Sequence, residues 1–508
     1  MANRLEENAA RHWRFRELIT RNNYTTVVER CVCKDDRIPE DGFRLCVTAS
    51  GRAEISCSNA RGERYADEAL ARLTGKEGTL VAEVEDHPSF ALRGIIEGFY
   101  GEPYAWEKRH DVIDFLYRHR MNAYFYAPKD DAYHRDLWRE PYPQTWLDQI
   151  AALVRCARDK EIGFYYCLSP GKDFRFSAEE DYDLLLKKYE QVAALGVDRF
   201  AVLFDDICAE LSPQDARQFS CAAQAHCHVA NILNAKLRHT GSLIFCPTDY
   251  AQNTDTPYRR AVRKYLDRDI CVIWTGYNCV AEAIPERDCI AARKAFRRPL
   301  VLWDNYPVND FQPKSRIYLD AVCNRTRTIA AYHTGCIANP SALWESSKFA
   351  LSAMAEWMWN VEMYDEEGAY RRAVREHLGV AEEDYFFAGL NRSTVMRTYP
   401  SLKAAFERED WAYLDGWYVQ AERAVLRVRA HCRKELSLEW RDLFNYVLEE
   451  CRLYRALRSG AEIDGILSAM CSCAYRRADQ SILEYVKERT GRDITVPERE
   501  VFWDTERR

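Results

Sequence analysis

Residues 197–210 read VDRFAVLFDDICAE, and the apolar run within this stretch ends at two adjacent carboxylates, Asp205 and Asp206. Because the run does not alternate apolar and polar residues, it predicts a strand that is buried on both faces, as in a parallel sheet. One aspartate at such a strand end could cap the following helix, but capping explains only one of the two. The stretch therefore predicts both a strand and a chemical site at its end.

Seven other short apolar runs have the same character. They lie at residues 92–99, 122–128, 163–169, 242–248, 270–276, 299–305 and 335–340. Helical patterns separate them, for example at 105–120, at 177–196 and at 212–239, where Ser212 is the expected N-cap. Strands that alternate with helices indicate a parallel sheet. Eight such units in roughly 265 residues predict an α/β fold of the closed (β/α)8 TIM barrel type, whose typical length is about 250 residues. In this fold, active sites form at the carboxyl ends of the strands.

The segments on either side of the barrel have different patterns. Residues 1–91 contain three strand-like runs and one helical run, which predicts a small α/β domain. We place the barrel at residues 92–362 and an all-α helical bundle at residues 363–508, with long helices at 410–434, 438–460 and 464–489. The broad apolar stripes of these helices are either the core of the bundle or a homodimer interface.

Composition limits the classes of partner. The net charge of the 508 residues is −7, and no basic block is present, so we expect no nucleic-acid partner. No unbroken apolar span is long enough to cross a membrane, and the charged N-terminus lacks the apolar core of a signal peptide. We therefore expect no membrane partner and a cytoplasmic location.

The cysteines do not predict a metal centre. The chain has 19 of them, an odd number, and most lie in apolar segments, as expected for reduced thiols. Zinc is the alternative, but Cys31-x-Cys33, Cys471-x-Cys473 and His226-Cys227-His228 lack the usual ligand spacing. We expect no metal and no cofactor.

Asp205 and Asp206 suit acid–base chemistry. Two close carboxylates raise one of their pKa values, so that one group can stay protonated while the other is ionised. Cleavage of a glycosidic bond uses such a combination, but in ordinary retaining enzymes the two groups face each other across the bond, about 5–5.5 Å apart. Neighbours on one strand fit better a mechanism in which the substrate supplies its own nucleophile, as the acetamido group of a 2-acetamido sugar can.

Several motifs together resemble one enzyme family. They are RGIIEGFYGEPYAWEKR, MNAYFYAPKDDAYHRDLWREPYP, LFDDI, CPTDY, WTG, VLWDNYPVND and IANP, in this order between residues 91 and 360. The chain is identified on them as a member of glycoside hydrolase family 84, the O-GlcNAcase and β-N-acetylglucosaminidase family. The resemblance implies a retaining exo-β-N-acetylglucosaminidase that releases β-linked N-acetylglucosamine from a glycoprotein, glycopeptide or oligosaccharide.

The resemblance also implies roles for single residues. Asp205 would bind the acetamido N–H and orient its carbonyl oxygen for attack, and Asp206 would protonate the glycosidic oxygen and later activate water. The residues matching sugar-hydroxyl ligands are Gly98, Lys129, Asn305, Asp310 and Asn339. Tyr250 matches a residue at the acetamido group, and Trp274 and Trp303 would form the wall of the pocket for its methyl group.

One departure from the family lies after WTG, where Tyr277, Asn278 and Cys279 replace a smaller and more apolar segment. We expect this departure to concern the aglycone side. Two alternative functions stay open: a catalytically inactive sugar-binding relative, and a hexosaminidase specific for β-linked N-acetylgalactosamine.

Overall fold

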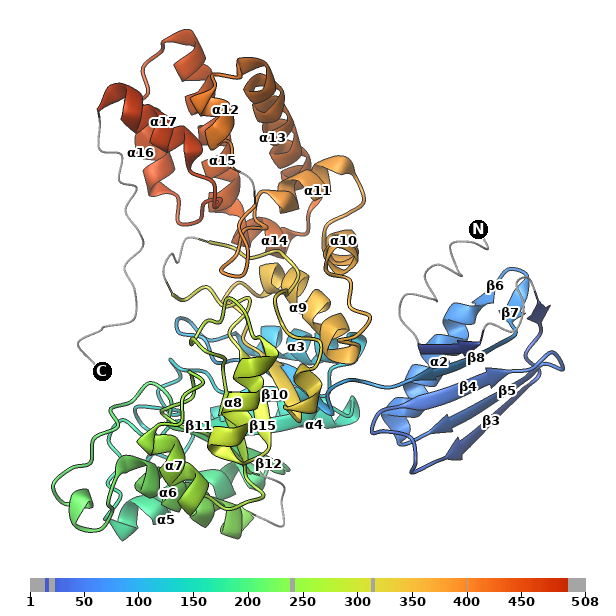
Figure 1. Cartoon of the computed structure of the whole chain (residues 1–508), viewed down its shortest axis with the longest axis vertical. Coiled ribbons are helices and arrows are strands. Elements are labelled where there is room, and N and C mark those ends of the chain that lie inside the picture. The colour runs from blue at the N-terminus through green and yellow to red at the C-terminus, as the bar shows by residue number, and fades with distance from the viewer. Residues whose placement is uncertain (1–13, 18–22, 238–242, 312–315, 400, 492–508) are drawn as a thin grey trace. The chain divides into compact units, whose positions relative to one another are not determined.

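The structure of the chain is a computed structural model that describes residues 14–17, 23–237, 243–311, 316–399 and 401–491 (Figure 1). Residues 1–13 and 492–508, at the ends of the predicted flanking domains, lie outside the described residues. The chain forms two compact units, Met1–Arg93 with Ala355–Asp365, and Gly94–Met354 with Glu366–Arg508. The predicted domain boundaries near residues 91 and 362 stay predictions.

The first unit is built on a five-stranded sheet with the order β1-β8-β4-β5-β3. Its strands are β3 (Glu29–Lys34), β4 (Phe43–Val47), β5 (Arg52–Cys57), β8 (Ala82–Asp86) and β1 (Arg14–Glu17), and a smaller sheet contains β2 (Tyr24–Thr25), β6 (Thr74–Gly75) and β7 (Gly78–Leu80). Helix α2 (Ala60–Leu73) packs on the large sheet through Tyr65 and Ala69. The predicted α/β character of this region is confirmed.

The second unit contains a closed parallel barrel, which confirms the predicted fold class. Its strands are β9 (Leu92–Ile96), β10 (Ala123–Tyr126), β11 (Gly163–Leu168), β12 (Arg199–Leu203), β13 (Leu243–Cys246), β14 (Cys271–Trp274), β15 (Leu300–Asp304) and β16 (Gly335–Ala338). Each of them falls within one of the eight predicted runs. In β12, Phe200–Leu203 is buried throughout, as expected for a strand covered on both faces.

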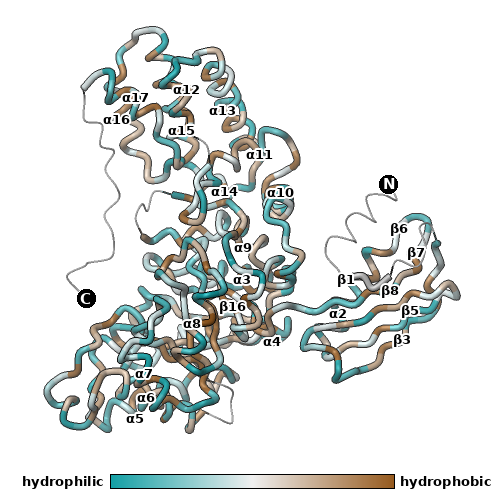
Figure 2. Tube along the Cα trace, viewed as in Figure 1, coloured by the Kyte–Doolittle hydropathy of each residue, from teal (hydrophilic) through white to brown (hydrophobic). Residues whose placement is uncertain are grey.

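Helices cover the outside of the barrel. They are α3 (Trp106–Arg118), α4 (Gln144–Asp159), α5 (Glu179–Ala193), α6 (Ala222–Leu237), α7 (Pro257–Tyr265), α8 (Glu286–Phe296) and α9 (Trp344–Trp359). Arg- and Lys-rich α7 is largely teal in Figure 2, as expected for a helix with a solvent-facing side. The prediction of a helix from Ser212 was wrong: Ser212 Oγ does accept the Asp215 amide, but the turn ends after Asp215–Arg217 and the long helix begins at Ala222.

The region after residue 365 is helical, as predicted. Its helices are α10 (Glu366–His377), α11 (Glu382–Gly389), α12 (Lys403–Glu407), α13 (Trp411–His431), α14 (Lys434–Glu439), α15 (Arg441–Ser459), α16 (Asp464–Ser472) and α17 (Ser481–Thr490). The single helix predicted at 464–489 is wrong, because α16 and α17 are separate. Between them, the Ala474 amide donates to Asp442 of α15 over 3.1 Å, so this segment is held by a neighbouring helix instead of its own helical hydrogen bonds.

Two further observations bear on the expectations from composition. None of the helices that the structure describes is long and apolar enough to cross a membrane. All 19 cysteines fall within the described ranges and are free thiols, although Cys33 and Cys208 are exposed. The cytoplasmic location stays a prediction.

Candidate active site

The carboxyl ends of the barrel strands meet at one rim, where three acidic residues are paired with arginine. Glu97, after β9, accepts two hydrogen bonds from Arg109, at 2.9 and 2.8 Å. Asp304, at the end of β15, accepts two from Arg325, at 2.9 and 2.8 Å. Asp249 is likewise paired with a buried arginine, Arg259. These carboxylates are fixed in the framework of the rim.

Asp205 lies two residues beyond β12 and is paired differently. Its Oδ2 accepts a hydrogen bond from the Nζ of Lys129, which follows β10. Its Oδ1 is buried and has no hydrogen-bond partner among the residues that the structure describes. A buried carboxylate oxygen without a donor is energetically unfavourable, so this oxygen is suited to accept a hydrogen bond from a ligand.

Asp206 has a φ angle of +52°, in the left-handed region that non-glycine residues rarely adopt. Its two carboxylate oxygens accept hydrogen bonds from tyrosines, Oδ1 from Tyr250 at 2.7 Å and Oδ2 from Tyr100 at 2.9 Å. Burial and the charge of Asp205 raise the pKa of Asp206, although Lys129 and the two tyrosine hydroxyls oppose this shift. The shift favours the protonated form of Asp206 relative to an ordinary aspartic acid.

Gly98, Trp303, Asn305 and Asn339 form one cluster beside Lys129. Asn305 Oδ1 accepts hydrogen bonds from Trp303 Nε1 at 2.8 Å and Asn339 Nδ2 at 2.9 Å. The Gly98 amide donates to Asn339 Oδ1 over 3.2 Å. A Cβ atom at position 98 would lie 2.5 Å from the Trp303 ring, so glycine is required by the close approach of the indole. Lys129 Nζ lies 5.7 Å from the centre of that ring, which links the cluster to Asp205.

Trp274 is the predicted residue that stands apart. Its indole is fully buried, stacks on His333 with 5.5 Å between ring centres, and donates from Nε1 to the Gln252 carbonyl oxygen over 2.8 Å. The neighbouring Thr275 amide donates to the Tyr250 carbonyl oxygen over 3.1 Å. The end of β14 thus supports the loop that carries Tyr250.

Cys279 contacts two of the predicted site residues, and the expectation that the departure after WTG concerns the aglycone side stays a prediction. Its Sγ lies 3.6 Å from Tyr250 Oη and 3.4 Å from Asn305 Nδ2, and its carbonyl oxygen accepts from Asn305 Nδ2 over 2.8 Å. Burial raises the pKa of its thiol to about 11, so the thiol is protonated near neutral pH.

Tyr100 and Arg135 complete the surroundings of Asp206, and the sequence did not single them out. Arg135 Nη1 donates to Tyr100 Oη over 3.0 Å. The Tyr100 amide donates to Asp310 Oδ2 over 2.7 Å, which links Asp310 to Asp206 through one residue. Tyr100 lies in EGFYG and Arg135 in DDAYHRDLW, within motifs that the sequence analysis quoted. Their position in these motifs was the signal that could have identified them as site residues.

The group most like a metal site in the described ranges lies elsewhere, at His119, Glu376 and His377. His119 Nε2 is 3.1 Å from Glu376, and the Nε2 of His377 lies 2.7 Å from Ser352 Oγ. These groups already pair with one another or with Ser352. His119 follows α3 and precedes β10, so it lies near the amino ends of the strands, away from the candidate site.

A closed (β/α)8 barrel with two adjacent carboxylates at the end of one strand, and further polar side chains at the other strand ends, is the arrangement expected of a glycoside hydrolase. The β-N-acetylglucosaminidase family model matches residues 93–388. The chain belongs to this family, which confirms the resemblance to glycoside hydrolase family 84.

Relatives and solved structures agree with this membership. The protein O-GlcNAcase of Mus musculus is 33% identical over 327 residues, which are 60% of this chain and 36% of that protein. The Rattus norvegicus protein O-GlcNAcase is 35% identical over 272 residues, 52% of this chain and 30% of that protein. The chain thus spans well under half of either relative.

Two solved structures share the architecture. A Thermobaculum terrenum O-GlcNAc hydrolase variant superposes with a TM-score of 0.72 at 26% identity, over 79% of this chain and 94% of the other. CpGH84B superposes with a TM-score of 0.76 over 96% of this chain and 94% of the other, and at 23% identity it shows the fold alone.

Proposed function

We propose that this protein is a retaining exo-β-N-acetylglucosaminidase that releases terminal β-linked N-acetylglucosamine from glycoproteins, glycopeptides or oligosaccharides. In the proposed mechanism, the carbonyl oxygen of the substrate's acetamido group attacks the anomeric carbon while the glycosidic oxygen leaves. The resulting oxazoline is opened by water, so that the product keeps the β configuration. No cofactor takes part.

The observation that carries the proposal is the asymmetry of Asp205. One of its oxygens is held by Lys129, and the other is buried without a donor among the described residues. An acetamido N–H would supply the missing donor, and the ionised carboxylate would stabilise the positive charge that develops on the closing ring.

Asp206 is the proposed general acid and, in the second step, the general base. The raised pKa that burial and Asp205 give it supports the acid role. Its two tyrosine partners hold the carboxyl group in one orientation without a fixed positive charge, so the proton can leave and return. Asp205 would therefore orient the acetamido group, and Asp206 would transfer the proton.

The remaining predicted residues are proposed to bind the sugar. Tyr250 would contact the acetamido group, and Trp303 would form the wall of its pocket. Trp274 is proposed to contribute to the same wall. Because its indole is fully buried, it would do so by supporting the loop that carries Tyr250. The proposed ligands of the sugar hydroxyls are Gly98, Lys129, Asn305, Asp310 and Asn339.

The test is hydrolysis of aryl β-glycosides of N-acetylglucosamine, N-acetylgalactosamine and glucose by the wild type and Asp205→Asn. We expect turnover of the N-acetylglucosaminide, no turnover of the glucoside, which lacks the acetamide, and a large loss in Asp205→Asn. Faster turnover of the N-acetylgalactosaminide would establish the second candidate specificity. No turnover together with binding of a thiazoline mimic of the oxazoline would identify an inactive sugar-binding relative.

A homodimer through the C-terminal helices is the proposed quaternary structure. On α13, Val419 and Leu426 are 68% and 53% exposed and lie seven residues apart, on one face of the helix. A second copy of the chain would cover this face. Light scattering on the full chain and on Val419→Lys tests it: a dimeric wild type and a monomeric variant are expected, and a monomeric wild type would exclude the dimer.

A further inference from the structure

The two sugar ligands Asn305 and Asp310 share one loop, which begins after β15. The first half of this loop, residues 305–311, is hydrogen-bonded to its second half, which begins at residue 316. Tyr306 Oη donates to the Asp320 carbonyl oxygen over 2.6 Å, and Asn309 Nδ2 donates to the Arg316 carbonyl oxygen over 2.8 Å. The position of the first half of the loop therefore depends on what holds the second half.

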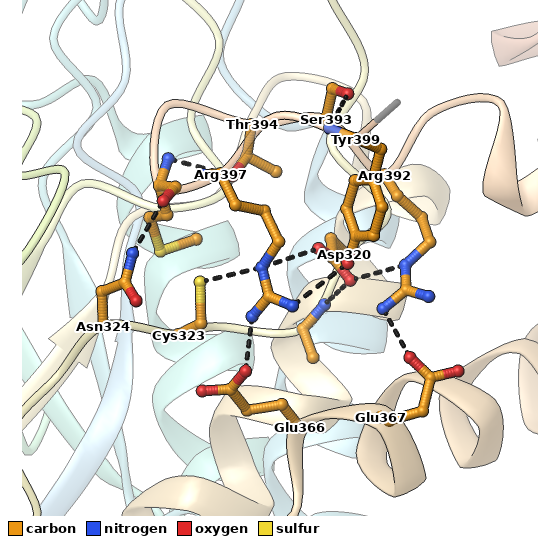
Figure 3. Close-up of polar contacts among 12 residues, drawn as sticks. Asp320, Cys323, Asn324, Glu366, Glu367, Arg392, Ser393, Thr394, Arg397 and Tyr399 are labelled. Atoms are coloured by element: carbon orange, nitrogen blue, oxygen red, sulfur yellow. Dashed lines mark hydrogen bonds and ion pairs between the residues drawn. The ribbon is translucent and has the colours of Figure 1, made fainter. Parts of the chain in front are cut away.

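Asp320 is the anchor of that second half. Its carboxylate is almost fully buried and accepts from Arg392 Nε at 3.0 Å on Oδ1 and from Tyr399 Oη at 2.9 Å on Oδ2. Arg397 Nε lies 3.6 Å from Oδ2. Figure 3 shows the three side chains converging on Asp320 from the segment between α11 and α12.

The arginines that reach Asp320 are themselves held by α10. Arg397 Nη2 donates to Glu366 at 2.5 Å, and Arg392 Nη2 lies 2.8 Å from Glu367 (Figure 3). The Arg392 guanidinium also stacks over Tyr399, with 4.6 Å to the ring centre. Each arginine thus bridges Asp320 and an acidic residue of α10, so the anchor does not depend on a single flexible side chain.

The backbone of the loop is tied to the same segment at two points. The Leu319 amide donates to the Asn391 carbonyl oxygen over 3.2 Å, and Asn324 Nδ2 donates to the Met396 carbonyl oxygen over 2.7 Å. The family model ends at residue 388, so the segment 391–399 lies just beyond the matched region.

We propose that Asp320, Arg392 and Tyr399 are positioning residues for sugar binding, which they support by fixing the loop that carries Asn305 and Asp310. This inference rests on the proposed function for the role of those two ligands. If the inference holds, the segment 391–399 contributes to sugar binding, although none of its residues lies at the ends of the barrel strands.

The variant that tests the inference is Tyr399→Phe, which removes a single hydroxyl group from Asp320. Its matched control is Tyr418→Phe: the Tyr418 hydroxyl donates to a buried carboxylate, Glu450, over 3.1 Å, and that carboxylate is also held by an arginine, Arg477. Both variants lose one hydrogen bond to a buried carboxylate. Tyr399→Phe also removes the acceptor of a hydrogen bond from Arg397 Nη1, at 3.1 Å, so its loss of thermal stability should be at least as large as that of Tyr418→Phe.

Three readouts separate positioning from general stability. For Tyr399→Phe, we expect KM for an aryl β-N-acetylglucosaminide and Kd for the thiazoline mimic to rise about five-fold, the size expected for one net hydrogen bond. Amide hydrogen exchange within residues 305–311 should become faster, while the pH profile of kcat stays unchanged because Asp206 is not touched. Tyr418→Phe should alter none of these readouts.

Two other outcomes would lead to different conclusions. The inference is overturned if Tyr399→Phe leaves KM, Kd and exchange in residues 305–311 as in Tyr418→Phe. If the wild type neither hydrolyses the substrate nor binds the mimic, the proposed function has failed, and the exchange measurement alone still decides whether Tyr399 orders the loop.

Discussion

Glu97 and Asp304 lie at the same rim of the barrel as Asp205 and Asp206, but they have different partners. Each of the first two is held by two hydrogen bonds from one arginine. Asp205 instead has a lysine on one oxygen and, within the described part of the chain, no donor on the other, and Asp206 has two tyrosine hydroxyls. An arginine that donates to both oxygens holds a carboxylate in one geometry, whereas Asp205 keeps one oxygen without a donor among the described residues and Asp206 is held by neutral hydroxyls.

The difference separates two uses of a buried carboxylate. A carboxylate with both oxygens satisfied by arginine contributes to the order of the rim and has no oxygen left for a ligand. At the end of β12, Asp205 is less well satisfied and Asp206 adopts a rare backbone conformation, which costs on the order of 1–3 kcal/mol and must be compensated by the surrounding packing. Functional sites are where such costs are expected.

The largest expected effect comes from Asp206→Asn. With an alkyl N-acetylglucosaminide, whose leaving group needs protonation, kcat/KM should fall on the order of 10³-fold. With an activated aryl substrate the fall should be much smaller, because a good leaving group departs without a proton. Steady-state kinetics on both substrates checks this, and equal losses would contradict the acid role of Asp206.

The corresponding variant for a carboxylate that is paired with arginine is Arg109→Met. The free energy of unfolding should fall by about 3–5 kcal/mol, because Glu97 would stay buried without its counter-ion. Urea denaturation measures the change. Adding Glu97→Gln should restore part of the stability, since the unpaired charge is then gone. A loss below about 0.5 kcal/mol would place this ion pair among the weak surface pairs and remove the contrast between the two kinds of carboxylate.

The smallest effect is expected in the pH profile of Tyr250→Phe. The Tyr250 hydroxyl lowers the pKa of Asp206, so its removal should raise that pKa. Because the first step needs protonated Asp206, the decline of kcat/KM with rising pH should move to higher pH. Tyr124→Phe is the control, since its hydroxyl donates to Glu97 instead. A shift to lower pH, or the same shift in both variants, would contradict the assignment.

The sequence was most informative where burial leaves a continuous signal. All eight barrel strands could be predicted because parallel strands covered on both faces are apolar throughout, as in Phe200–Leu203. The break between α16 and α17 could not be predicted, because the hydrogen bond from the Ala474 amide to Asp442 depends on tertiary packing. Local helical periodicity contains no trace of such a contact.

The sequence predicted which residues form the candidate site better than it predicted the contacts between them. All the predicted residues except Trp274 are linked by contacts that the structure contains, directly or through Tyr100 and Cys279. The contact of Cys279 with Tyr250 joins loops after β13 and β14, and that of Tyr100 with Asp206 joins loops after β9 and β12. Loop-to-loop contacts of this kind arise from the closed barrel and are not encoded in the spacing of residues along the chain.

The close packing of Trp303 on Gly98 has a practical consequence for anyone who redesigns the pocket. Even alanine at position 98 would bring a methyl carbon to 2.5 Å from the indole, so mutant libraries should leave that codon fixed. Cys279 is the better position to randomise, because its side chain touches Tyr250 and Asn305. Selection for new sugar preferences should begin there.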